Sequence, residues 1–145
     1  MIGRALTERP ELFGVAILRV AVSDAVRKET TPSGPRNVSE FGSVTTEDGF
    51  RALLEMSPYH HIKDGVRYPA VLLTHGFNDS RTAPWHSAKM AARLQAATSS
   101  GKPVLLRIDY ESGHGIVTTK KQQQEEFADI LSFILWQCHT WDPPS

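Results

Sequence analysis

Two side chains whose types could serve hydrolysis follow two apolar segments of the sequence. Asp79 lies in HGFNDSRTAPWHS, directly after the apolar run YPAVLLT, and His114 lies between two glycines in SGHG. A carboxylate that accepts a hydrogen bond from an imidazole holds the ring in one tautomer, and the ring can then take a proton from a hydroxyl group. The pair therefore predicts an acid–base site for hydrolysis that requires a separate nucleophile.

Each of the two residues has a simpler explanation when it is considered alone. The dipeptide Asn78-Asp79 is typical of turns, and a turn is the favoured interpretation of an isolated Asn-Asp pair. The glycines beside His114, however, allow a sharp turn that exposes an imidazole at the end of a strand. The order of strand, Asp79 loop, helix, strand, His114 loop and helix matches the Ser, Asp, His order of α/β-hydrolases.

No serine of the sequence has the surroundings of the nucleophile that such a pair would activate. A nucleophile elbow has the pattern G-x-S-x-G at a tight turn between a strand and a helix, upstream of the aspartate. The 145 residues do not contain this pattern. Ser33 lacks the first glycine and a following helix, and Ser87 lies after Asp79 within a predicted helix. We expect neither serine to be the nucleophile.

The elements that would position Asp79 and His114 alternate between strands and helices. Strands are predicted where apolar residues run together, and helices where apolar residues recur at every third or fourth position. The predicted strands span residues 13–22, 70–74 and 104–109, and the predicted helices span residues 1–8, 45–57, 84–98 and a C-terminal segment that includes 127–135. The alternation predicts an α/β fold, with a mostly parallel sheet and helices on both faces.

Three of the helices are expected to bury one apolar face. The residues on these faces are Phe50, Leu53 and Leu54, then Met90, Ala91 and Leu94, and finally Phe127, Ile130, Leu131, Ile134 and Leu135. Thr45 or Thr46 is predicted to cap the first of these helices. Residues 23–43 are rich in Pro, Gly, Ser and Thr and are predicted to form a long loop, which in a compact domain is often functional.

The composition indicates one soluble globular domain. Of the 145 residues, 40% are hydrophobic and 22% are charged, with 16 basic and 16 acidic side chains. This balance gives no reason to expect a nucleic acid or an anionic membrane as a partner. No apolar run approaches the roughly 20 residues that cross a bilayer, and the single cysteine, Cys138, cannot form an internal disulfide. We expect a cytoplasmic or periplasmic location, between which the composition does not distinguish.

Metal and phosphate sites are disfavoured by the spacing of the residues. The histidines other than His114 are His60, His61, His75, His86 and His139. They show neither H-x-x-x-H nor H-E-x-x-H spacing, so we interpret them as loop and surface residues and expect no metal ion. The segment SSGKP resembles the end of a phosphate-binding loop, but Pro103 occupies its Ser/Thr position. We expect no cofactor.

Several longer segments resemble the catalytic domain of the prolyl oligopeptidase family of serine peptidases. The segments that carry the resemblance are ERPELFGVAILRVAVSDAVR, EFGS, MSPYHHIKDGVRYPAVLLTHGFNDSRTAPWHSAKMAARLQ and VLLRIDYESGHG. The similarity covers nearly the whole chain, from about Gly3 to Trp136. The resemblance implies the C-terminal half of an α/β-hydrolase fold, with residues 1–145 as a partial catalytic domain. It also implies that the serine, in a G-G-S-x-G-G motif, precedes the segment that residues 1–4 resemble. The family's oxyanion tyrosine and β-propeller are likewise expected to lie outside this sequence.

The resemblance assigns catalytic and substrate-binding roles residue by residue. Asp79 matches the triad aspartate of the family, and His114 matches the histidine of its G-H-G loop. Arg81 matches an arginine that donates hydrogen bonds to a backbone carbonyl of the substrate, a role suited to five donors in a rigid fork. The alternative for Arg81 is an ion pair with a carboxylate of a nearby loop.

Three further positions match the pocket that holds a proline side chain in the family. They are Val22, Phe41 and Thr82. The ring-stacking tryptophan of the family's prolyl-specific members would align with Asn37, and the valines that follow the arginine are replaced by Thr82 and Ala83. These departures leave the specificity for proline open.

The resulting expectation is a serine-type oligopeptidase that hydrolyses peptides with a Ser-Asp-His triad. Because the sequence contains the Asp and the His but no serine elbow, we expect the chain to be inactive by itself. One alternative is a non-catalytic binding or complementing module that assembles with a separately encoded N-terminal half, since an exposed sheet edge needs a partner. Another is an independent small α/β binding protein that has lost catalysis.

Overall fold

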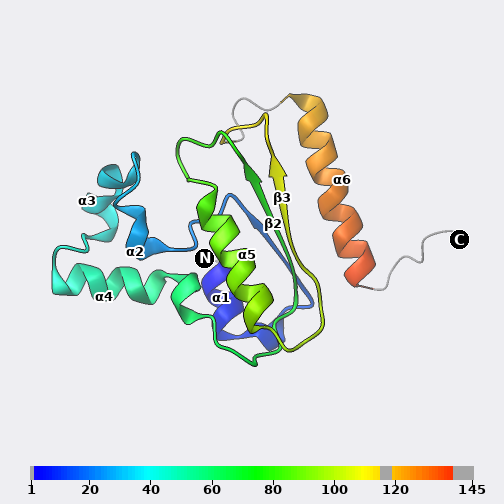
Figure 1. Cartoon of the computed structure of the whole chain (residues 1–145), viewed down its shortest axis with the longest axis horizontal. Helices are drawn as coiled ribbons and strands as arrows, with labels where there is room; N and C mark the ends of the chain where they lie inside the picture. Colours follow the sequence, from blue (N-terminus) through cyan, green and yellow to red (C-terminus); the bar gives the residue numbers. More distant parts are fainter. Residues whose placement is uncertain (1, 115–118, 139–145) are drawn as a thin grey trace, which may run out of the picture.

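A three-stranded parallel sheet forms the centre of the computed structural model, which describes residues 2–114 and 119–138 (Figure 1). The strands are β1, Val15–Arg19, β2, Ala70–Gly76, and β3, Val104–Asp109, and their order in the sheet is β1-β2-β3. In the register, Val71 lies beside Ala16 on one side and Val104 on the other. The carboxyl ends of all three strands therefore lie at the same edge of the sheet.

Helices cover both faces of this sheet. The α-helices of the described residues are α1, Ile2–Glu8, α2, Ala25–Lys28, α3, Val38–Phe41, α4, Glu47–Met56, α5, Trp85–Ala97, and α6, Lys120–Gln137. Short 3₁₀ helices span Pro10–Leu12, Gly34–Asn37 and Pro58–His61. Helices α1 and α5 pack on one face of the sheet and α6 on the other (Figure 1). The predicted α/β fold, with a parallel sheet between helices, is confirmed.

The larger part of the core lies between the sheet and helices α1 and α5. Its buried residues are Leu6, Ala16, Leu18, Ile62, Tyr68, Val71, Leu73, Met90, Ala91, Leu94, Ala97 and Val104. The predicted inward positions on α5, which are Met90, Ala91 and Leu94, are confirmed. Every residue of β2 is buried, as expected for a central strand with helices on both faces. The loop that leaves β2 therefore starts from a rigid position.

Helix α6 covers the opposite face through a narrower contact. Ala70, Leu72, Ile130 and Phe133 form this second cluster of buried residues. The expectation that Phe127, Leu131 and Leu135 would also be buried is wrong, because they are 56%, 48% and 42% exposed. Helix α6 contacts β1 and β2, and its Asp129 also forms an ion pair with Arg107 of β3.

Strand β1 is shorter than predicted. It ends at Arg19 instead of Val22, because Val20 has a φ of 49° that turns the chain out of the sheet. A valine rarely adopts this left-handed conformation, since its branched side chain crowds the backbone. Apolar composition alone predicted that the strand would continue, and it carried no signal for the turn.

The segment 23–43 is not the long loop that its composition predicted. It contains α2, the 3₁₀ helix Gly34–Asn37 and α3. Asp24 begins α2 by accepting a hydrogen bond from the backbone N–H of Arg27, which is a helix-capping signal within a segment otherwise typical of turns. The next helix, α4, begins as predicted at Thr46, whose side chain accepts from the backbone N–H of Gly49. On α4, Leu53 is buried but Phe50 is exposed, which corrects the predicted face.

Candidate active site

The carboxyl ends of β2 and β3 bring Asp79 and His114 together. Nδ1 of His114 lies 2.7 Å from Oδ2 of Asp79. Because an ionised carboxylate only accepts hydrogen bonds, Nδ1 of His114 carries the proton and donates it, and Nε2 keeps a lone pair. The imidazole is 31% exposed while the carboxylate is buried. The pair therefore has the tautomer and the access that a general base requires.

A tight turn holds the carboxylate of Asp79 in place. Its Oδ1 accepts hydrogen bonds from the backbone N–H groups of Arg81 and Thr82, each at 2.8 Å. Burial acts to raise the pKa of Asp79, but the hydrogen bonds from Thr82, His114 and Arg81 outweigh it and hold the pKa below its ordinary value. Asp79 is therefore an anion at neutral pH, with one oxygen bound to the backbone and the other facing His114.

A glycine at the end of β2 allows the two loops to approach each other. A Cβ atom on Gly76 would lie 2.4 Å from the carbonyl oxygen of Gly113 and 2.6 Å from that of Ser112. The loops are also joined by a hydrogen bond from the backbone N–H of Asn78 to the carbonyl of Ser112, at 3.0 Å. The amide of Asn78 donates a further bond to the carbonyl of Tyr110. These contacts place the His114 loop directly against the start of the Asp79 loop.

A second histidine lies beneath the turn at Asp79. The Nε2 atom of His75 lies 2.8 Å from the carbonyl oxygen of Thr82 and 3.5 Å from Oδ2 of Asp79, and its Nδ1 atom lies 2.7 Å from Oγ of Ser87. The interpretation of His75 and His86 as loop or surface residues is wrong, because both are buried. The feature of the sequence that could have indicated burial of His75 is its position at the end of an apolar strand.

Arg81 is held by its backbone, while its side chain is exposed. The carbonyl oxygen of Arg81 accepts hydrogen bonds from Nζ of Lys28, at 2.7 Å, and from Oγ of Ser33, at 2.6 Å. Among residues 2–114 and 119–138, no carboxylate forms an ion pair with its guanidinium group. The alternative expectation of such a pair therefore receives no support from the described residues. The contact with Lys28 joins α2 to the Asp79 loop, and no pattern in the sequence indicates it.

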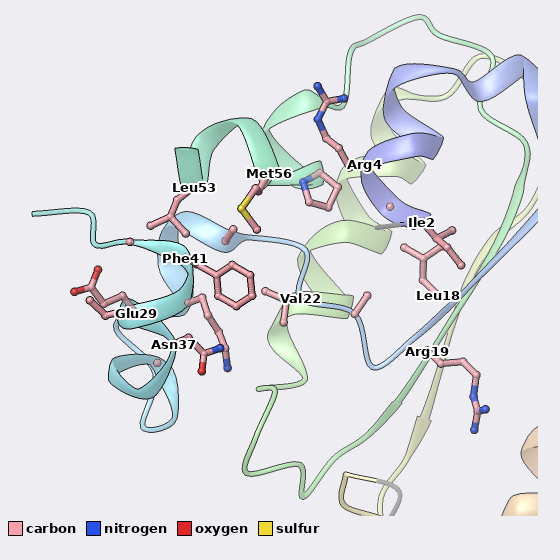
Figure 2. A pocket seen from close by; sticks show the side chains of 18 of the residues that line it. Ile2, Arg4, Leu18, Arg19, Val22, Glu29, Asn37, Phe41, Leu53 and Met56 are labelled. Carbon is pink, nitrogen blue, oxygen red and sulfur yellow. The ribbon is translucent and has the colours of Figure 1, made fainter. Parts of the chain in front are cut away.

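A pocket of about 610 Å³ lies beside β1, between α1 and the segment that contains α2, α3 and α4 (Figure 2). Val22 and Phe41 both line it, as does Asn37, and Figure 2 shows the Phe41 ring near Val22. Thr82 is buried next to Asp79 and is not among the lining residues. The structure thus brings two of the three expected pocket residues together and places the third in the Asp79 loop.

The described parts of the chain contain neither a metal-binding cluster nor a membrane-spanning helix. Within them, no group of three or more His, Cys, Asp or Glu side chains could hold a metal ion. His139, one of the histidines weighed as possible metal ligands from the sequence, lies outside the described residues. None of the helices in these parts is long and apolar enough to cross a bilayer.

Comparisons with known proteins identify relatives of a single family. The model of the prolyl oligopeptidase family matches residues 1–140. A prolyl endopeptidase from Elizabethkingia meningoseptica is 36% identical over 138 residues, which is 94% of this chain and 20% of the relative. A prolyl endopeptidase from Dictyostelium discoideum is 34% identical over 136 residues, covering 92% of this chain and 18% of the relative. The chain thus spans about a fifth of the length of these relatives.

Solved structures show the same relationship. A structure from a study of two prolyl endopeptidases has a TM-score of 0.89 and 35% identity, and the match covers 93% of this chain and 20% of the other. Oligopeptidase B from Leishmania major has a TM-score of 0.87 and 27% identity, with 93% of this chain and 19% of the other covered. The parallel sheet with helices on both faces is accordingly part of an α/β-hydrolase catalytic domain. The chain belongs to the prolyl oligopeptidase family of serine peptidases.

Proposed function

We propose that Asp79 and His114 are the acid and the base of a serine peptidase site that hydrolyses peptide bonds. The observation that carries this proposal is the 2.7 Å contact between Nδ1 of His114 and Oδ2 of Asp79, with the imidazole exposed and the carboxylate buried. This arrangement leaves Nε2 of His114 with a lone pair for a hydroxyl group. The serine that carries the hydroxyl belongs to a part of the catalytic domain that these 145 residues do not include.

The reaction follows from the two protonation states. Nε2 of His114 takes the proton of the serine hydroxyl as the serine oxygen bonds to the carbonyl carbon of the peptide. The same proton is then donated to the amine that leaves when the C–N bond breaks. In the second half of the reaction, Nε2 of His114 takes a proton from a water molecule as the water oxygen bonds to the acyl carbon. The proton is then donated to the serine oxygen as its bond to the acyl group breaks, and the acid is released. Asp79 stays ionised throughout and stabilises the imidazolium that forms.

Arg81 and the pocket beside β1 are proposed to bind the peptide. The guanidinium of Arg81 is exposed and, among the described residues, has no carboxylate partner, so its donors are available to a backbone carbonyl of the substrate. Val22 and Phe41 line the pocket and present apolar surface to the side chain before the scissile bond. Thr82 supports this site from beneath through its contact with Asp79. The substrate is therefore a peptide with an apolar residue before the cleaved bond.

The chain by itself is proposed to be inactive. Ser87 is fully buried and lies against His75, so its hydroxyl is inaccessible to a peptide. Oγ of Ser33 is bound to Lys28 and to the carbonyl of Arg81. His114 consequently has neither of these hydroxyl groups to activate.

A chimera tests the proposed function. This chain replaces the matching part of the Elizabethkingia meningoseptica prolyl endopeptidase, so that the relative supplies the serine. We expect the chimera to cleave a fluorogenic peptide and to react with a fluorophosphonate probe. His114→Ala or Asp79→Ala should lower kcat/KM by about a thousandfold or more. His61→Ala, in a histidine away from the pair, should leave the rate unchanged. Equal activity of the His114→Ala and His61→Ala chimeras contradicts the proposal.

A second candidate function is that of a complementing module for a separately encoded N-terminal half. The observation that favours it is the edge position of β1 in the described sheet, with an apolar pocket directly beside that edge (Figure 2). A strand added to this edge would satisfy the free backbone groups of β1 and close the pocket. Mixing the chain with a separately produced N-terminal part of the same relative should give a one-to-one complex with peptidase activity. Two folded parts that remain monomeric when mixed at micromolar concentration argue against this role.

A further inference from the structure

We propose that His75 is a positioning residue for the Asp79–His114 pair: its imidazole holds the turn at Asp79 from beneath and keeps Oδ2 of Asp79 directed at His114. This inference rests on the proposed function, because it assigns a role within the same site. The observation behind it is that His75 is within reach of both Asp79 and Thr82, at 3.5 Å and 2.8 Å from its Nε2 atom. The side chains of His75 and Asp79 are both fully buried.

The hydrogen-bond partners of His75 determine its tautomer. The carbonyl oxygen of Thr82 can only accept, so Nε2 of His75 must carry a proton and donate it. Nδ1 is then the acceptor, and the hydroxyl of Ser87 donates to it over 2.7 Å. Both ring nitrogens are thus occupied, and Nε2 also lies 3.5 Å from Oδ2 of Asp79. The imidazole cannot turn without breaking a buried hydrogen bond.

Thr82 transmits this constraint to Asp79. Its backbone N–H donates to Oδ1 of Asp79, and its carbonyl accepts from His75, so the residue is held on both sides. With Oδ1 bound to the backbone, the second oxygen of Asp79 is directed away from the turn, where His114 meets it at 2.7 Å. A rotation of the Asp79 carboxylate would break the contacts with Thr82 and His114 together.

The support for the turn comes from two regular elements. His75 lies within β2, and Ser87 lies in the first turn of α5. Their hydrogen bond therefore connects the Asp79 loop to the sheet and to a helix that pack against each other in the core. Side chains on such rigid elements position a site more accurately than contacts within a loop. The buried location excludes His75 itself as the base that a peptide would meet.

Nuclear magnetic resonance of the ¹⁵N-labelled 145-residue chain tests the proposal without any need for peptidase activity. Long-range ¹H–¹⁵N spectra report which nitrogen of each imidazole carries the proton. We expect the proton of His75 on Nε2 and that of His114 on Nδ1. A wild-type chain in which His75 carries its proton on Nδ1 overturns the proposal, because such a ring cannot donate to Thr82.

Variants then separate positioning from packing. His75→Gln retains an N–H donor near the original Nε2 position, whereas His75→Phe retains a ring without a donor. We expect exchange of the His114 Nδ1 proton with water to be at least about tenfold faster in His75→Phe, and close to the wild-type rate in His75→Gln. Amide protection in α5 and α6 serves as the control for the fold. Equal exchange in the two variants assigns His75 to packing alone and overturns the proposal.

A smaller change covers the case in which His75→Phe does not fold. Ser87→Ala removes only the hydroxyl that holds Nδ1 of His75, and it should also accelerate exchange of the His114 proton. An unchanged rate in Ser87→Ala overturns the proposal. The outcome is independent of the proposed peptidase activity, because the His114–Asp79 bond is read directly. An inactive chimera with an intact bond would instead count against the proposed function.

Discussion

Gly76 at the end of β2 lies directly against Gly113 in the loop that carries His114. A Cβ atom built on Gly76 would come within 2.4 Å of the carbonyl oxygen of Gly113 and 2.8 Å of Oγ of Ser112. Both contacts are closer than carbon and oxygen atoms can approach without a shift of the chain. The end of β2, which leads to Asp79, therefore determines how closely the loop that carries His114 can approach.

Gly76→Ala is expected to separate the side chains of Asp79 and His114. The added methyl group meets backbone atoms, which cannot move aside as a flexible side chain would, so the His114 loop must shift outward. We expect a loss of about 1–3 kcal/mol in the free energy of unfolding and loss of the His114 Nδ1 proton signal. Gly113→Ala is the control, because its nearest neighbour would be the carbonyl oxygen of Asn78 at 3.5 Å. A wild-type spectrum for Gly76→Ala contradicts the prediction.

Glu126 on α6 should contribute more to stability than its neighbour Glu125. Its carboxylate accepts hydrogen bonds from Oγ1 of Thr74 at 2.6 Å and from Nη2 of Arg19 at 2.8 Å, so it joins α6 to β2 and β1. Glu126→Gln should cost about 1–3 kcal/mol at pH 7 by urea denaturation. Glu125→Gln changes an exposed carboxylate near Lys121 and should cost less than about 0.5 kcal/mol. Equal costs for the two variants would contradict this role of Glu126.

The cost of Glu126→Gln should also depend on pH. Burial acts to raise the pKa of Glu126, but the hydrogen bonds from Arg19 and Thr74 outweigh it and lower the pKa. A carboxylate with a lowered pKa stabilises the fold above its unfolded pKa, about 4.3, and this stabilisation is lost as the pH falls through the folded pKa. The difference between wild type and Glu126→Gln should therefore shrink below about pH 4. A difference that stays constant down to pH 3 would show that the charge is not the cause.

His86 should make the fold sensitive to mild acid. Burial, with a smaller contribution from the charge of Lys28, lowers its pKa from 6.5 to about 4. Its Nδ1 accepts from the backbone N–H of Asp24, and its buried Nε2 has no partner among the described residues. The unfolded chain thus binds a proton between pH 6.5 and 4 that the folded chain does not, so stability falls as the pH drops through this range.

The dependence of stability on pH between 6.5 and 4 should be largely lost in His86→Gln. In the wild type we expect the free energy of unfolding to fall by up to about 3 kcal/mol between pH 7.5 and 4, and much less in the variant. His61→Gln, which changes a part-exposed histidine, should retain the wild-type slope. Urea denaturation at a series of pH values checks the prediction. A slope that persists in His86→Gln would assign the acid sensitivity to other groups.

The positions of Asp79 and His114 were predictable because they depend on topology. Both residues follow apolar segments that form neighbouring parallel strands, and such strands bring their carboxyl ends to one edge. His75 was not predictable in the same way. Its role depends on Ser87 and Thr82, whose distances from it are set by how α5 packs on β2 and not by local sequence.

Other differences between the predicted and the observed structure also arise where the composition or period of a segment does not decide its conformation or burial. Helix α6 has the predicted period, yet Leu131 is exposed while Phe133 is buried, because burial depends on which strands lie beneath the helix. The short helix α2 depends on one capping residue, Asp24, in a segment whose composition favours turns. The turn at Val20 occurs at a residue type that favours strands. Burial on α6 thus depends on tertiary packing, whereas α2 and the turn at Val20 depend on single residues whose behaviour the composition of the segment does not reveal.

Val20 should tolerate glycine better than a valine within β1. Its φ of 49° costs a β-branched residue about 1–2 kcal/mol, which glycine would not incur. Because glycine also loses about 0.5–1 kcal/mol through greater chain entropy, Val20→Gly should leave the free energy of unfolding within about 1 kcal/mol of wild type. Val15→Gly changes a part-buried valine at the start of the same strand, where glycine brings no relief, and should cost clearly more. Urea denaturation of the two variants decides the matter, and an equal cost would show that the turn at Val20 is unstrained.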